Sequence, residues 1–139
     1  MDAEQRQQAE SLVAGAVGWG GAWTLVYAAG QAALNGTDPS STDLAVRLTY
    51  AALDLSFALT ELESVVPPEV GRAAVDLGEL SRVDGQSVAA AVVDLVVAAE
   101  RAVIDAAAHA GPDVTSTLLG ARVSSLLSAA RLKLSGGAW

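Results

Sequence analysis

The sequence predicts an all-α fold, a single-domain helical bundle of four long helices and one short helix. Apolar residues make up 52% of the 139 residues and charged residues only 17%, which is enough apolar surface for one core. The apolar positions recur at steps of three and four, and no segment alternates in steps of two. Turn signals divide the chain at 35–39, 67–68, 84–85 and 111–112. We therefore expect residues 1–139 to form one bundle of largely antiparallel helices, with a flexible tail at about 135–139.

The first helical segment, 3–34, is rich in glycine. Each glycine inside a helix costs about 1 kcal/mol relative to alanine. We therefore expect a kink or break near residues 18–21, or a second helix crossing closely at the glycines, and both one helix and two helices stay open. The part from 12 to 34 carries no charge and is long enough to span a membrane, but its glycines and the absence of flanking basic residues favour a buried helix.

The second helix is expected to begin at the cap candidates of 40–42 and to end before Pro67. A stripe at steps of four and three predicts its buried face: Leu44, Leu48, Ala51, Leu55, Ala58 and Leu62. Four further apolar side chains are expected to widen that face: Val46, Tyr50, Leu53 and Phe57. Three charged residues lie seven apart and are expected to form a solvated line on the opposite side: Arg47, Asp54 and Glu61.

Three helices are expected after Pro67. A short helix, 69–80, is expected to follow Pro68, which suits the first turn of a helix. A long one, 86–110, is capped by Asp84, ends at Gly111 and is apolar nearly all round, which is typical of a central helix. The last helix, 113–134, is expected to bury one row of apolar residues in the core: Leu119, Val123, Leu126, Ala130 and Leu134.

The composition excludes several kinds of chemistry. The chain has no cysteine and one histidine, so thiolate metal sites, disulfides and His-rich metal sites are absent. No paired E-x-x-H, G-x-S-x-G or phosphate-loop motif occurs. A net charge of −8 argues against a general nucleic-acid binder. We therefore predict a non-enzymatic protein with no catalytic residue, metal or cofactor, located in the cytoplasm because the acidic start lacks the basic region of a secretory signal.

Three groups of residues are candidates for contacts with other molecules. Aromatic side chains are candidate partner or ligand contacts: Trp19, Trp23, Tyr27 and Trp139. A polar, weakly charged face of the last helix is a candidate oligomer face: Ser124, Ser128 and Arg131. Four residues of 86–110 are candidate buried polar or pH-sensitive groups, or part of an ordinary surface ladder: Asp94, Arg101, Asp105 and His109.

The preferred interpretation is a non-catalytic scaffold or adaptor that binds proteins and associates with itself through small-residue and aromatic helix faces. One alternative is a regulatory module that binds a small apolar ligand in a cavity lined by Trp19, Trp23, Phe57 and the valines of 86–110. Another alternative is an acidic inhibitor of a partner protein. The sequence identifies neither the partner nor the oligomeric state.

Two short motifs carry a resemblance to a known family. Trp19-Gly20-Gly21 reads as W-x-G, and the stretch from Tyr50 to Asp54 reads as Y-x-x-x-D. Together they resemble the signature of the small secreted helical-hairpin proteins of type VII secretion. In that family the first motif lies at a turn between two long helices and the second motif ends the second helix. The resemblance implies a helical protein without catalytic residues, and it covers only these two motifs.

Overall fold

The computed structural model of the chain describes residues 3–35, 42–66 and 85–135. Within these ranges the elements are all α-helices, and they confirm the predicted fold class: α1 (Ala3–Gly15), α2 (Gly18–Asn35), α3 (Thr42–Leu62), α5 (Gly85–His109) and α6 (Val114–Leu134). The predicted short helix 69–80, the Asp84 cap and residues 136–139 lie outside the described residues.

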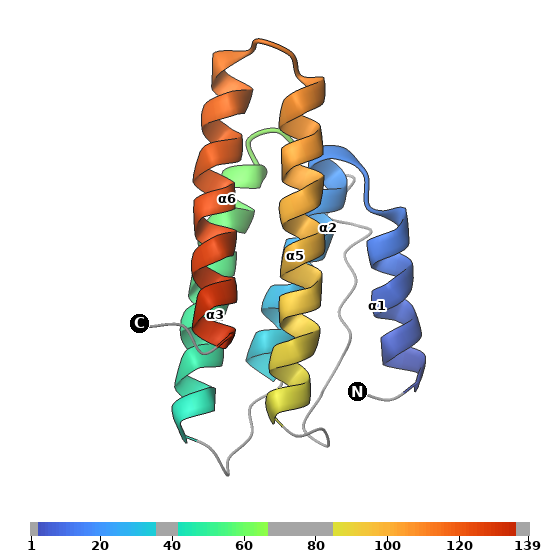
Figure 1. Cartoon of the computed structure of the whole chain (residues 1–139), viewed down its shortest axis with the longest axis vertical. Coiled ribbons are helices and arrows are strands. Elements are labelled where there is room, and N and C mark those ends of the chain that lie inside the picture. The colour runs from blue at the N-terminus through green and yellow to red at the C-terminus, as the bar shows by residue number, and fades with distance from the viewer. Residues whose placement is uncertain (1–2, 36–41, 67–84, 136–139) are drawn as a thin grey trace.

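Four helices stand at the corners of a bundle, in the order α2, α3, α6, α5 around its axis (Figure 1). Neighbouring helices are antiparallel, while α3 and α5 run in the same direction on one diagonal. This is the arrangement of bundles that contain a long crossover connection. The fifth helix, α1, packs on α2 and α5, on the side of the bundle that faces away from α3 and α6 (Figure 1).

The core is built from alanine, leucine and valine. The predicted stripe of α3 is buried throughout, from Leu44 at 7% exposure to Leu62 at 0%. The four alanines Ala28, Ala29, Ala51 and Ala99 are completely buried, so the helices meet through side chains of minimal size. In α6 the predicted inward residues are buried except Leu126, which is half-buried, while Leu127 is fully buried. The bundle interior is therefore narrow.

The predicted break of the first segment is found two residues earlier than expected. Ala16 and Val17 separate α1 from α2, and Gly18 has a left-handed backbone with φ of +67°. Gly20 and Gly21 lie inside α2. A Cβ on Gly21 would lie 2.7 Å from the carbonyl carbon of Ala16, so only glycine lets the chain fold back this tightly. Among the described helices, none is long and apolar enough to cross a membrane.

The turn between α5 and α6 follows its predicted signals. Gly111 ends α5 with φ of +69°. Asp113 caps α6, and its carboxylate accepts hydrogen bonds from the Ser116 hydroxyl at 2.7 Å and from the Thr115 N–H at 3.2 Å. The Ser116 hydrogen bond is the main reason why the pKa of Asp113 lies below its ordinary value. The cap is therefore complete at neutral pH and weakens as the carboxylate is protonated below pH 3.8.

Two alanine substitutions in α2 should have opposite effects. A Cβ on Gly30 would lie 3.8 Å from the Cβ of Leu55, an ordinary contact, so Gly30→Ala should stabilise the fold by about 1 kcal/mol through helix propensity. Gly21→Ala should destabilise it by about 1–3 kcal/mol because the new Cβ overlaps the Ala16 backbone. Urea unfolding followed by circular dichroism measures both changes. An increase in stability for Gly21→Ala would contradict the tight joint.

Candidate functional site

The outward side of α3 carries a line of large apolar side chains. Val46, Tyr50, Leu53 and Phe57 are 41–54% exposed and follow one another at steps of four, three and four. The prediction that they widen the buried face is wrong. α3 packs against α2 on one flank and α6 on the other, and the core takes the Leu44–Leu62 stripe, so this line is left at the surface.

The charged line of α3 faces α6 and is not solvated as predicted. The Glu61 carboxylate accepts from Nε of Arg122 at 3.1 Å, and Asp54 pairs with Nζ of Lys133. Arg47 donates to the backbone oxygen of Lys133 at 3.1 Å. The Asp54 and Lys133 side chains are only 15% and 23% exposed, so the pair is partly withdrawn from water. These interactions fix α3 and α6 side by side.

The outward side of α6 carries a second line of apolar and small side chains. Leu118 and Leu132 are 54% and 51% exposed, and Ala121 and Ser125 lie exposed between them. No charged side chain interrupts this spacing of four and three along α6. We call the combined surface the α3/α6 face, and it consists of Val46, Tyr50, Leu53, Phe57, Val114, Leu118, Ala121, Ser125 and Leu132.

The predicted oligomer face lies at the edge of the α3/α6 face, toward α5. Ser124, Ser128 and Arg131 are all half-buried. Nε of Arg131 donates to the Glu100 carboxylate of α5 at 2.9 Å. Arg131 therefore holds α5 and α6 together, and the most exposed positions of α6 are those of the α3/α6 face. The sequence contains a signal for this surface that was not used: Leu118, Ala121, Ser125 and Leu132 recur at helical spacing on one side of the last helix.

The aromatic candidates of α2 belong to the core or its border. Trp23 is 7% exposed and its ring stacks on Tyr27, with 5.3 Å between centroids and 13° between planes. Trp19 is half-buried beside Gly120, where a Cβ would lie 3.8 Å from its ring. Trp139 lies outside the described residues. Because Phe57 points outward, the predicted ligand cavity of Trp19, Trp23 and Phe57 does not form.

The two motifs that resemble type VII secretion proteins lie on separate helices. Trp19-Gly20-Gly21 lies in the first turn of α2, behind the break that separates α1 from α2. Tyr50 and Asp54 lie inside α3, which continues to Leu62, whereas the family's second motif ends its helix. Asp54 is engaged by Lys133. The position of the second motif thus departs from the family's pattern.

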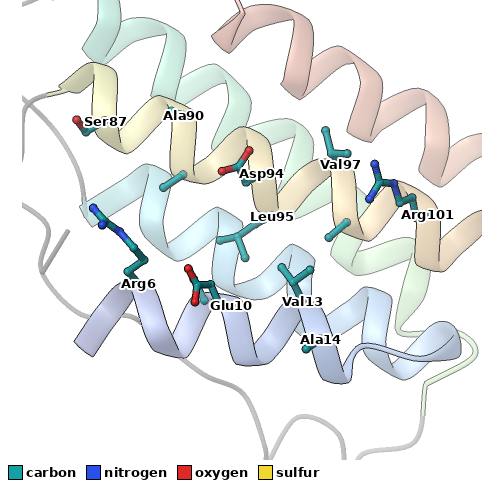
Figure 2. A pocket seen from close by; sticks show the side chains of 13 residues that line it. Arg6, Glu10, Val13, Ala14, Ser87, Ala90, Asp94, Leu95, Val97 and Arg101 are labelled. Atoms are coloured by element: carbon teal, nitrogen blue, oxygen red, sulfur yellow. The ribbon is translucent and has the colours of Figure 1, made fainter. Parts of the chain in front are cut away.

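A groove of about 790 Å³ runs between α1 and α5 (Figure 2). Its floor is apolar, with Leu95 and neighbouring alanines, and Glu10 of α1 lies across the groove from Asp94 of α5. Asp94 is exposed and not buried among the valines. Four charged side chains line the groove, and no ion pair joins them within the described ranges: Arg6, Glu10, Asp94 and Arg101.

Asp105 and His109, the other two candidate pH-sensitive residues of α5, lie beyond Arg101 on this helix. Asp105 and His109 are both exposed. Nδ1 of His109 lies 2.7 Å from the backbone oxygen of Asp105, as expected if the ring N–H donates within its own helix. Neither residue lines the groove. Asp105 and His109 therefore form an ordinary surface pair in the last turns of α5.

Removing the partly buried ion pair should cost more than removing the exposed one. Lys133→Ala leaves the Asp54 carboxylate without its cation, and we expect a loss of about 1.5–3 kcal/mol of stability. Arg122→Ala removes a pair whose side chains are 54% and 38% exposed, and the expected loss is below about 1 kcal/mol. Chemical unfolding of both variants gives the comparison. Equal losses would mean that Asp54 and Lys133 do not fix α3 on α6.

The described residues thus offer two surfaces to other molecules, the largely apolar α3/α6 face and the charged groove beside α1. The α3/α6 face lies on the side of the bundle opposite α1 (Figure 1). No protein-family model, curated protein or solved structure matches the chain, so its function is inferred from these two surfaces.

Proposed function

We propose that this protein is a non-catalytic assembly protein that associates with itself through the α3/α6 face. One observation carries the proposal. Within the described ranges, twelve large apolar side chains are exposed, and seven of them lie on this one face. Monomeric proteins rarely expose a contiguous apolar patch larger than a few hundred Å², and larger patches mark interaction sites.

The charged side chains of the α3/α6 face are paired with one another, which supports an apolar, salt-tolerant contact. Glu61, Asp54, Arg122 and Lys133 lie between its α3 and α6 halves, and they form two ion pairs across the two helices. A second copy placed on the face would therefore meet no unpaired charge from these four residues. The net charge of −8 then acts only as a weak long-range repulsion, which salt screens.

A second candidate function rests on the groove between α1 and α5. Its apolar floor and its border of Arg6, Glu10, Asp94 and Arg101 suit a small amphipathic molecule better than a purely apolar one. Binding there would raise the melting temperature in proportion to ligand concentration. This function needs no contact at the α3/α6 face, so the two candidates are separable by variants of that face.

A charge introduced into the centre of the face should dissociate the assembly. Leu53→Glu places a carboxylate where the partner would bury it, and we expect the dissociation constant to rise at least about tenfold, which corresponds to about 1.4 kcal/mol. Ile104→Glu is the matched control, because Ile104 is 61% exposed but lies on α5. Size-exclusion chromatography with light scattering over a hundredfold range of concentration measures the mass.

The wild-type chain and Ile104→Glu should form a species larger than 14.0 kDa that Leu53→Glu loses. Circular dichroism should show the same helix content in all three proteins, because both substituted side chains are exposed. A wild-type mass of 14.0 kDa at every concentration would contradict the proposed function.

A further inference from the structure

We infer that the groove between α1 and α5 binds an amphipathic primary amine, whose ammonium group lies between Glu10 and Asp94. The inference rests on the second candidate function, for which it names the class of ligand, and it is independent of the contact at the α3/α6 face. It draws on three observations: the order of the charges along the groove, the apolar walls on one side of the carboxylates, and the slight attachment of α1 to the bundle.

The charged groups that oppose each other across the groove are the two carboxylates (Figure 2). Glu10 comes from α1 and Asp94 from α5, whereas Arg6 lies toward one end of the groove and Arg101 toward the other. Within the described ranges no ion pair engages either carboxylate. Two facing negative charges repel each other, so a cation placed between them is attracted by both and an anion is repelled by both.

A primary ammonium group can use both carboxylates at once. It carries three N–H donors, and each carboxylate accepts hydrogen bonds on its two oxygens. Glu10 and Asp94 are exposed, so their side chains can turn toward a group that enters the groove. A primary amine is charged at neutral pH because its pKa resembles that of lysine, about 10.4. A quaternary ammonium group has no N–H to donate, so the arrangement favours the primary amine.

The apolar part of the ligand has a place on the side of the carboxylates that leads to Arg101. Four apolar side chains line this part of the groove: Val13, Ala14, Val97 and Ala98. Val13 is 42% exposed, so a tail that lies on it removes apolar surface from water. Arg101 follows Asp94 by two helical turns, which is about 11 Å along α5. A second cationic group at the far end of the tail would meet Arg101, so a monoamine fits better than a polyamine.

The helix that supplies Glu10 is only slightly attached to the bundle. No side chain of α1 is fully buried, and Ala9 and Leu12 pack on the core while partly exposed. An ammonium group held by Glu10 of α1 and by Asp94 of α5 joins the two helices directly. Binding should therefore slow the local opening of α1, which gives the site a signature of its own.

Three probes with the same alkyl tail test the head group: octylamine, octan-1-ol and octanoate. Calorimetric titration of the full chain should show octylamine binding about tenfold more tightly than octan-1-ol, because two exposed ion pairs contribute about threefold each. Octanoate should bind more weakly than octan-1-ol. In the double variant Glu10→Gln/Asp94→Asn the advantage of octylamine over octan-1-ol should disappear.

The double variant Glu63→Gln/Asp105→Asn is the matched control. It loses the same two negative charges at exposed positions outside the groove, so it should keep the wild-type affinity for octylamine. This control separates the groove carboxylates from the general attraction of cations to a chain of net charge −8. Circular dichroism should show the same helix content in both double variants and the wild type, because all four substituted side chains are exposed.

Hydrogen exchange locates the bound octylamine. Exchange of the α1 amides should slow severalfold when octylamine is added to the wild type, and the effect should be lost in Glu10→Gln/Asp94→Asn. Octylamine bound on the α3/α6 face would leave α1 exchange unchanged, because that face lies on the opposite side of the bundle. Unchanged α1 exchange at saturating octylamine would therefore overturn the inference.

Two further results would also overturn the inferred ligand: equal octylamine affinity of the wild type and Glu10→Gln/Asp94→Asn, or octanoate binding as tightly as octylamine. If octanoate slows α1 exchange, the groove remains a ligand site and the second candidate function stands. Failure of all three probes to bind would overturn that function together with the inference. The mass measured by light scattering tests the proposed assembly separately.

Discussion

The narrow alanine-lined interior is the constraint on which the rest of the structure depends. Where Ala28, Ala51 and Ala99 are fully buried, the backbones of the helices approach closely and leave little room for large side chains. Tyr50 and Phe57 stay outside although their side chains are larger than the alanines inside. The same constraint that makes the core tight thus produces the apolar surface.

Helix positions were predictable because each depends on local signals. The cap at Asp113, the left-handed Gly111 and the stripe from Leu44 to Leu62 are all readable from neighbours in the chain. The position of the break between α1 and α2 was harder to predict. Residues 18–21 contain most of the local glycines, yet the break depends on which glycine adopts a positive φ and which lies against Ala16, and composition does not distinguish them.

The face of α3 could not be predicted from periodicity. Two apolar stripes run along this helix with the same spacing, one through Leu48 and Leu55 and one through Tyr50 and Phe57. The choice between them depends on packing against helices distant in the sequence: α3 contacts α6, where Asp54 reaches Lys133, 79 positions away, and Glu61 reaches Arg122. A pattern within 21 residues contains no information about such partners. For the same reason Asp94, flanked by valines in sequence, was not recognisable as an exposed groove residue.

The diagonal placement of α3 and α5 has a consequence for how the chain folds. The four-helix bundle consists of two hairpins, α2 with α3 and α5 with α6, whose helices are neighbours in both sequence and space. The contacts of α2 with α5 and of α3 with α6 join one hairpin to the other and close a much longer loop. Because local contacts close shorter loops than distant ones, we expect docking of the two hairpins to be the slow step of folding. The ion pairs between α3 and α6 form in that step, and the surface that they align exists only once it is complete.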